Sequence, residues 1–192
     1  SVISVTASYT DGQGTAESVT SSATSAVKAL PVFVPPSSPE KKQQVDERPR
    51  ITEADDSITD QADVNLRMMG GNDYVEITGG INNFANGNQG DDRFVLRAGQ
   101  KGQYLGGKGA DTFEVFGGID AYANGQKGSD QMILRGGLGR YLGGDDGDRI
   151  EVFAAVSGSS VNGNRGEDTI IGSVAGVTYR GGADADLMLV SQ

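Results

Sequence analysis

Seven aspartates recur at nearly constant spacing through the C-terminal part of this 192-residue sequence. Each follows a glycine-rich stretch and precedes a short apolar segment, as in GGKGADTFEV at residues 106–115. The aspartates are Asp73, Asp92, Asp111, Asp130, Asp148, Asp168 and Asp186. Consecutive members of this row differ in residue number by 19, 19, 19, 18, 20 and 18, which is typical of a fold built from stacked repeats.

The chemistry of such a row is that of cation binding. In a stack of strands each carboxylate would lie roughly 5 Å from the next one. Two like charges at that distance repel by about 3 kcal/mol at an effective dielectric constant of about 20, and physiological salt does not screen them. The row therefore needs a counter-charge, protonation or side chains that splay outward. Carboxylate and glycine-turn carbonyl oxygens are the ligands of Ca²⁺, which we expect between successive turns.

Composition excludes other classes of site. The sequence has no cysteine and no histidine, so it contains no disulfide, no thiolate or imidazole metal site and no histidine base. Its net charge of -10 argues against binding of nucleic acid. It has no apolar run long enough to span a membrane, so we expect no membrane insertion. The periodic row accounts for the carboxylates, and we expect no enzyme; a polysaccharide-active β-helix enzyme with paired carboxylates is the less favoured alternative.

The elements that position the aspartates are predicted to be short strands. The residues two places after each aspartate are all apolar, and those four places after are apolar in six of seven cases. This alternation predicts a strand whose even positions face inward. A second position recurs in the other half of each repeat and is aromatic or apolar. We interpret these residues as a column that packs in the core on one face: Phe84, Tyr104, Tyr122, Tyr141, Val161 and Tyr179.

The distribution of glycine and proline agrees with tight corners between paired strands. Of the 30 glycines, 28 lie from Gly70 onward, whereas all five prolines precede residue 50. The sequence thus predicts an all-β protein with a right-handed parallel β-solenoid of the β-roll type over residues 70–192. Each turn is expected to match the step between successive aspartates, about 19 residues, and to contain two strands. Residues 51–69, with a strand near Leu66, are predicted to form an N-terminal cap.

The N-terminal part has a different composition. Alternating residues in 1–27, divided by a turn at Asp11–Gly14, predict a β-hairpin, and the proline- and charge-rich residues 28–50 predict a linker. The motif SYTDGQG followed by a Ser/Thr-rich strand resembles the closing hairpin of bacterial immunoglobulin-like or cadherin-like tandem repeats. The partner strands are then expected upstream in a longer precursor or in another chain. A disordered Ser/Thr-rich leader is the alternative.

The corner motif is itself similar to a known one. GGKGADTFE at residues 106–114 matches the nonapeptide G-G-x-G-x-D-x-U-x, and GNQGDDRFV, GQKGSDQMI and GNRGEDTII match with Asn or Gln at the second glycine. The chain therefore resembles the repeats-in-toxin (RTX) calcium-binding β-roll. The resemblance implies that all seven aspartates ligate Ca²⁺ together with backbone carbonyls of the same turns. Asp146 and Asp184 depart from the motif by taking its fourth position, and they are additional candidates.

The sequence departs from that family in one respect. RTX rolls repeat the motif every nine residues, whereas here only alternate half-turns carry the aspartate, which predicts a single row of at most six sites. The alternative explanation for the aspartates is an Asx-turn hydrogen bond at each corner, with no metal.

These features predict a non-enzymatic, calcium-binding structural or adhesive module of a large secreted or cell-surface bacterial protein. A carbohydrate or a cell surface is the expected adhesive partner. The alternative is an assembly subunit of a filament, a surface layer or a virus-particle appendage. In that case the chain would pair with itself or a neighbour through residues 1–34 and the last strand, Leu187–Val190.

Overall fold

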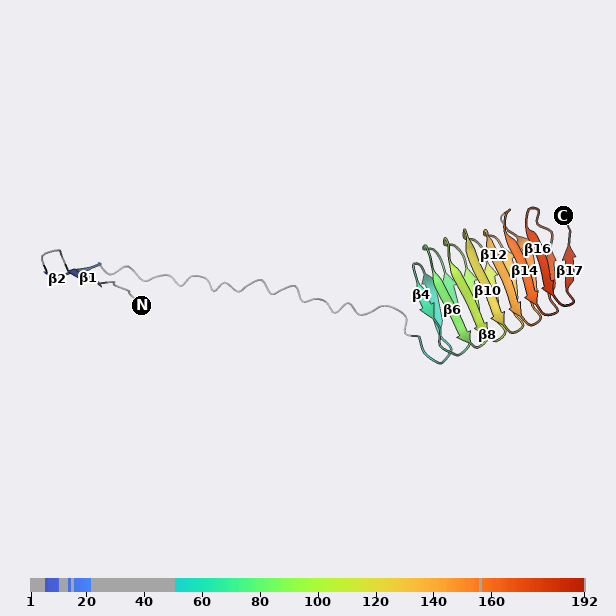
Figure 1. The fold of residues 1–192 in the computed structure, drawn as a ribbon, viewed down its shortest axis with the longest axis horizontal. Coiled ribbons are helices and arrows are strands. Elements are labelled where there is room, and N and C mark those ends of the chain that lie inside the picture. Colours follow the sequence, from blue (N-terminus) through green and yellow to red (C-terminus); the bar gives the residue numbers. More distant parts are fainter. Residues whose placement is uncertain (1–5, 11–13, 15, 22–50, 156, 192) are drawn as a thin grey trace. The chain divides into compact units, whose positions relative to one another are not determined.

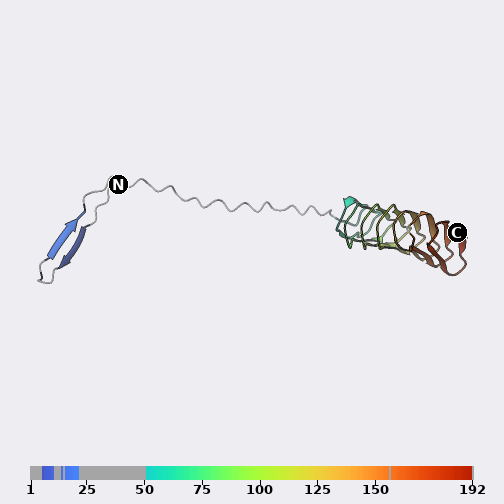
Figure 2. The same cartoon turned by 90° about the horizontal axis from the view of Figure 1, so that it is seen from above.

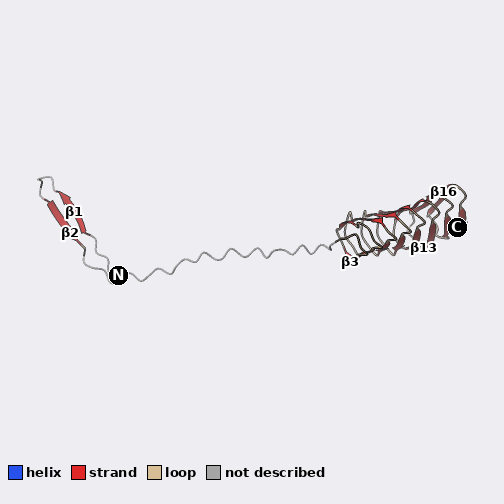
Figure 3. Cartoon of the chain, turned by 90° about the horizontal axis from the view of Figure 1, so that it is seen from below, coloured by secondary structure: helices blue, strands red, loops and turns tan. Residues whose placement is uncertain are grey.

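A computed structural model describes residues 6–10, 14, 16–21, 51–155 and 157–191 of the chain. The chain forms two units, Ser1–Glu47 and Arg48–Gln192, which are described separately. Both are built from strands (Figure 3). The described residues contain no helix that is long and apolar enough to cross a membrane.

The N-terminal unit contains the predicted hairpin. Strands β1 (Thr6–Thr10) and β2 (Ala16–Thr20) are antiparallel, and the Thr6 and Thr20 side chains form a hydrogen bond of 3.0 Å between their hydroxyls. The predicted turn at 11–13, the end of the predicted second strand at 22–27 and the predicted linker at 28–50 lie outside the described residues.

The C-terminal unit is the predicted parallel β-solenoid, in which successive strands alternate between two sheets (Figures 1 and 2). The eight-stranded sheet contains β3 (Ser57–Gln61), β5 (Tyr74–Ile77), β7 (Arg93–Leu96), β9 (Thr112–Val115), β11 (Gln131–Arg135), β13 (Arg149–Ala154), β15 (Thr169–Gly172) and β17 (Leu187–Val190). The seven-stranded sheet contains β4 (Asn65–Arg67), β6 (Phe84–Gln89), β8 (Gln103–Lys108), β10 (Ala121–Lys127), β12 (Gly139–Asp145), β14 (Ser160–Arg165) and β16 (Thr178–Ala183).

The register confirms the predicted turn length and the two strands per turn. Phe94 pairs with Phe113 in one sheet and Ala85 with Tyr104 in the other, so that both sheets advance by the step that separates Asp92 from Asp111. Residues 51–69, expected to be a cap, form a first turn of the same kind, because β3 pairs in parallel with β5 and β4 with β6.

The core consists of inward-facing columns between the two sheets. The predicted even positions are buried, and the rings of Phe94 and Phe113 stack with centroids 4.7 Å apart. The last turn differs because no further turn covers it: Met188 is 40% exposed and Val190 is only half-buried.

The expected single aromatic ladder is wrong. Register places Ala85, Tyr104, Ala123, Tyr141, Val161 and Tyr179 in one inward column. Phe84 and Tyr122 precede the inward residues of their strands by one position, so they lie on the outer face. Successive residues of the proposed ladder are 18, 19 or 20 positions apart in the sequence. A shift of one residue in a strand moves a side chain to the opposite face of the sheet.

Candidate functional site: an interior column of aspartates

The seven predicted aspartates form one column along the solenoid. Each lies at the corner between a strand of the seven-stranded sheet and the next strand of the eight-stranded sheet, as Asp92 does between β6 and β7. Six of them are buried with 1–3% of their surface exposed, and only Asp186 in the last turn is half-buried. The carboxylates therefore face the interior, and splaying outward is not how the structure limits their repulsion.

One oxygen of each carboxylate joins two turns. Oδ1 of Asp111 accepts a hydrogen bond of 2.8 Å from the backbone N–H of Asp92, and the N–H of Asp111 donates in turn to Oδ1 of Asp130 at 2.8 Å. Equivalent hydrogen bonds, 2.7–3.1 Å long, run from the backbone N–H of an aspartate to Oδ1 of the aspartate in the next turn; the donors are Asp56, Asp73, Asp130, Asp148 and Asp168. This bond connects neighbouring turns, whereas an Asx turn would be closed within a single corner.

The second oxygen has no partner. Oδ2 is buried without a hydrogen-bond donor in six aspartates: Asp73, Asp92, Asp111, Asp130, Asp148 and Asp168. A buried acceptor without a donor is costly and calls for an explanation, such as an ion or a proton.

A backbone carbonyl lies beside this oxygen. A Cβ atom added to Gly106 would overlap Oδ2 of Asp111 and would lie 2.6 Å from the carbonyl oxygen of Gly125 in the next turn. The equivalent glycines Gly87, Gly125, Gly143 and Gly163 face the same pair of oxygens. Five corners thus bring a carboxylate oxygen and a carbonyl oxygen, both acceptors, to the same small space.

This geometry explains the glycine motif. The glycine five residues before each aspartate from Asp92 onward leaves the room that the carboxylate occupies. The residues four and two places before it have positive φ, as Gly107 (123°) and Gly109 (132°) do. Asn88 and Asp146 adopt positive φ at equivalent positions, which fits the tolerance of Asn and Asp for this region.

Burial raises the pKa of these carboxyl groups. Desolvation is the main cause, and neighbouring aspartates add to it, while the backbone hydrogen bond to Oδ1 opposes it. The pKa of Asp111 rises to about 6, those of Asp92 and Asp148 to about 7 and that of Asp130 to about 8. The pKa values of Asp73 and Asp168 are raised too. Without a cation, some of these carboxyl groups are therefore protonated near neutral pH.

The two additional candidates lie elsewhere. Asp146 and Asp184 are exposed at the outer corner, where each accepts a weak hydrogen bond of 3.2 Å from a backbone N–H, that of Gly128 and that of Gly166. They therefore do not share the interior position of the seven aspartates.

Sequence reasoning missed Asp56, which begins the column. Its N–H donates to Oδ1 of Asp73 at 2.7 Å, and its own carboxylate accepts from the N–H of Thr52 at 2.7 Å. The available signal was the buried Ile58 two residues later. The step from Asp56 to Asp73 is shorter than the steps between the other aspartates, and no glycine-rich stretch precedes Asp56. The spacing rule therefore did not include it.

The oxygen atoms that could ligate a metal ion at these corners are compatible with a hard cation. A ligand set of oxygens only suits Ca²⁺. Among the described residues, no group of three or more acidic side chains is arranged to hold a metal ion by itself. A cation in this column would therefore need glycine carbonyls in addition to aspartates.

Comparison with protein-family models, with curated proteins and with solved structures finds no match to this chain.

Proposed function

We propose that this chain is a calcium-stabilised structural module in which the column from Asp73 to Asp186 and the adjoining glycine carbonyls bind Ca²⁺. The supporting observation is the row of buried Oδ2 atoms that lack donors and lie beside carbonyl oxygens. Two acceptors held together require either a proton or a cation. The cation alternative is favoured because it serves every corner without requiring protonation of the carboxyl groups at neutral pH.

The role that follows is that of a stiff rod in a secreted or cell-surface protein of the RTX type. Extracellular calcium modules bind the ion with dissociation constants of about 10⁻⁴–10⁻³ M, so such a rod would fold where calcium is plentiful. In the absence of calcium, repulsion within the acidic column opposes folding. We further propose that the module is not an enzyme, because the carboxyl groups follow the repeat.

Calcium titration of the metal-free chain tests this proposal. We expect Ca²⁺ to increase the β signal in circular dichroism and to raise the unfolding temperature, with chelation reversing both changes. Mg²⁺ at the same concentration should have a much smaller effect, because it demands regular octahedral geometry. Calorimetry of the full chain should detect several bound ions. A chain that is fully folded in excess chelator at neutral pH and binds no Ca²⁺ would contradict the proposal.

A second candidate function, as an assembly subunit, is favoured by the C-terminal end of the stack. Leu187 and Leu189 in β17 are 53% and 55% exposed, and Met188 is 40% exposed. This last strand pairs only with β15 within the described residues, and an open apolar edge is a site for strand pairing with another chain.

Sedimentation at increasing concentration tests the second candidate. Leu189→Lys should abolish association through this edge, whereas Ile119→Lys, at a residue that is 54% exposed on a side corner, should not. If the unaltered chain is monomeric at all concentrations in calcium, this assembly role is wrong.

A further inference from the structure

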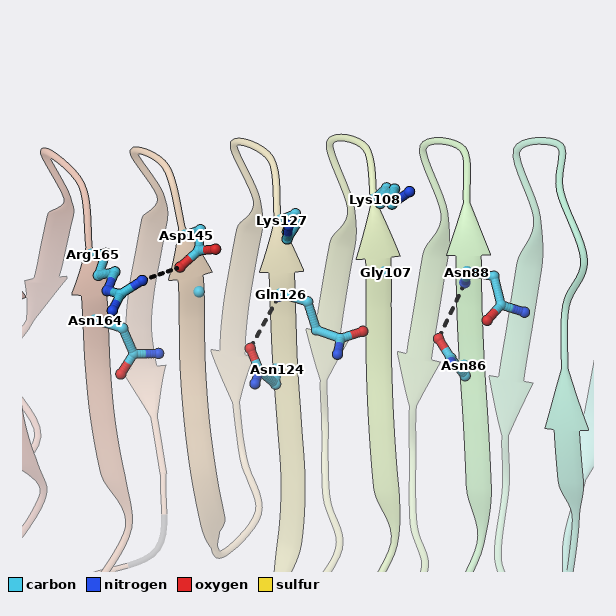
Figure 4. A pocket seen from close by; sticks show the side chains of 11 residues that line it. Asn86, Asn88, Gly107, Lys108, Asn124, Gln126, Lys127, Asp145, Asn164 and Arg165 are labelled. Atoms are coloured by element: carbon cyan, nitrogen blue, oxygen red, sulfur yellow. Dashed lines mark hydrogen bonds and ion pairs between the residues drawn. The ribbon is translucent and has the colours of Figure 1, made fainter.

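A shallow polar groove of about 500 Å³ crosses the outer face of the seven-stranded sheet, from β6 to β14 (Figure 4). Side-chain amides line its floor and three cationic side chains follow one margin. The lining residues that matter for the argument are Asn88, Gly107, Gln126, Asn164, Lys108 and Lys127. None of them belongs to the interior aspartate column.

The groove repeats every two turns. Along one column of paired residues the order is Asn88, Gly107, Gln126, Gly144, Asn164, so that amides alternate with glycines. Two residues earlier in each strand the column is Asn86, Leu105, Asn124, Leu142, Asn162. With about 4.8 Å between neighbouring strands, equivalent amides recur roughly every 9.6 Å along the groove.

Intrachain hydrogen bonds orient the amides within each turn. Oδ1 of Asn86 accepts from the N–H of Asn88 at 3.2 Å, and Oδ1 of Asn124 accepts from the N–H of Gln126 at 3.0 Å (Figure 4). These contacts fix the first amide of the first two pairs, whereas in the third pair the Asn162 amide donates to Oδ1 of Asn164 at 2.6 Å. Asn88 and Gln126 are half-buried on the groove floor, where their amides can donate to and accept from hydroxyl groups.

Aromatic rings lie beside the first two amide pairs, outside the lining of the groove, and the third equivalent position is Ser160. Phe84 and Tyr122 lie two positions before Asn86 and Asn124 on the same outer face, and the Tyr122 hydroxyl accepts a hydrogen bond of 3.2 Å from the Asn124 amide. The intervening turn carries Gln103 at this position. An aromatic ring next to paired amides is a combination that suits a ligand with both apolar faces and hydroxyl groups.

The margin of the groove is cationic although the chain carries a net charge of -10. Lys108 and Lys127 are exposed and directly paired across β8 and β10. The margin continues with Asp145, which is paired with Lys127, and with Arg165, which lies 3.7 Å from Asp145. Like charges directly opposite each other in a sheet are destabilising. An anionic group bound across this pair would remove the repulsion.

We propose that this groove binds a linear acidic polysaccharide whose chemical repeat is a disaccharide. The two-turn period would present the same amide contacts to every second sugar, with an aromatic ring beside the first two amide pairs, and the two lysines would contact its carboxylate or sulfate groups. This site goes beyond the proposed structural role by giving the module an adhesive target of defined class. It is independent of the interior column, so calcium binding and glycan binding can be lost separately.

Binding of hyaluronan oligosaccharides to the full chain in calcium tests the proposal. Hyaluronan has one carboxylate per disaccharide, and cello-oligosaccharides of equal length are the neutral probe. We expect affinity for hyaluronan to increase with each added disaccharide, to exceed that for the neutral probe about tenfold or more, and to fall with salt.

Three variants locate the site. Lys108→Gln combined with Lys127→Gln should weaken hyaluronan binding about tenfold or more. Asn124→Leu should weaken it comparably and lower the unfolding temperature only slightly: the Gln126 N–H loses its side-chain acceptor, but leucine already occupies this column at 105 and 142. Lys101→Gln removes one lysine charge, half of that removed by the double variant, from an exposed residue outside the groove and should have no effect.

Several results would overturn the proposal. They are an absence of binding by the unaltered chain in calcium, equal binding of both probes, equal loss in Lys101→Gln, and a normal affinity in Asn124→Leu. Polyadenylate that binds as tightly as hyaluronan would show a general polyanion patch and would also overturn it. Calcium binding measured on the same samples reports separately on the interior column.

Discussion

Asp111 shows how a single side chain in this protein connects three turns. Its Oδ1 is bonded to the N–H of Asp92, its own N–H is bonded to Asp130, and its Oδ2 faces the carbonyl of Gly125. The first two contacts need only an acceptor and a donor, which an uncharged side chain could supply as well. The third brings two acceptors together, and the proposed role of Asp111 as a cation ligand rests on it.

Substitution of Asp111 separates these roles. Asp111→Asn keeps an acceptor at Oδ1 and places an amide donor beside the Gly125 carbonyl, so it should stabilise the metal-free chain while it weakens calcium binding. Asp111→Ala leaves the Asp92 N–H without an acceptor and should cost about 1–3 kcal/mol in either state. Urea unfolding with and without Ca²⁺ measures both effects. If Asn and Ala destabilise the metal-free chain equally, the Oδ2 argument is wrong.

Gly106 is required by the position of the carboxylate. A methyl group there would overlap Oδ2 of Asp111 and approach the Gly125 carbonyl to 2.6 Å, so Gly106→Ala should destabilise the chain by about 2 kcal/mol or more. Gly79→Ala is the matched control, because its methyl group would meet only Ala62 at 3.8 Å. Its unfolding free energy should change by less than about 1 kcal/mol. Equal destabilisation by both would argue against a tightly packed corner.

At the scale of strands, the repeating unit is two turns rather than one. The inward column alternates small and large residues, with Ala85 and Ala123 on either side of Tyr104. The residues that line the outer groove alternate with the same two-turn period. Contacts between turns reinforce the stack: the Arg97 guanidinium lies 5.2 Å from the centre of the Phe116 ring in the next turn, and Arg135 lies 5.0 Å from that of Phe153.

Deletion of whole turns tests this period. Removing residues 84–121 joins Asn83 to Tyr122 and retains the alternation, because Ala123 then takes the place of Ala85. Removing residues 103–121 places Ala85 next to Ala123 and leaves a void the size of the Tyr104 side chain. Although it removes fewer residues, we expect the single-turn deletion to lower the free energy of unfolding by about 3–5 kcal/mol more than the double-turn deletion does.

The comparison is made by urea unfolding in saturating Ca²⁺. A progressive loss of stability with the number of deleted residues would show instead that the turns are interchangeable.

At the scale of the whole molecule, the column links folding to the supply of protons or cations. Burial is the main cause of the raised pKa values of Asp92, Asp111, Asp130 and Asp148, which lie between about 6 and about 8, against 3.8 for the ordinary side chain. A carboxyl group whose pKa is raised by folding stabilises the folded state fully below its unfolded pKa. That contribution is lost as the pH rises through the folded pKa.

The calcium-free chain should therefore be more stable at pH 5 than at pH 8, and the loss should proceed from just above the ordinary pKa of 3.8 until the pH passes the folded values of about 6 to about 8. Saturating Ca²⁺ should reverse the order, because the ion binds the deprotonated carboxylates. Urea midpoints of calcium-stripped and calcium-saturated protein at the two pH values measure this. A stability independent of pH in both states would contradict an interior carboxyl column.

Much of the architecture follows from the sequence because it depends on spacing alone. The even recurrence of Asp92, Asp111 and Asp130 was sufficient to predict the parallel solenoid, the turn length and the column of carboxylates, and alternation after each aspartate predicted the inward faces. These features are periodic, so any register that stacks the motif reproduces them.

Only the tertiary structure decided which way side chains point and what they meet. It placed the carboxylates inside, bonded them to the N–H of the neighbouring turn, put Phe84 on the opposite face from Tyr104 and added Asp56 to the column. The reason is that facing depends on pairing between residues far apart in sequence, and a difference of one residue in spacing reverses it. The two-turn groove emerged for the same reason, since its alternation is visible only once β6, β8 and β10 lie side by side.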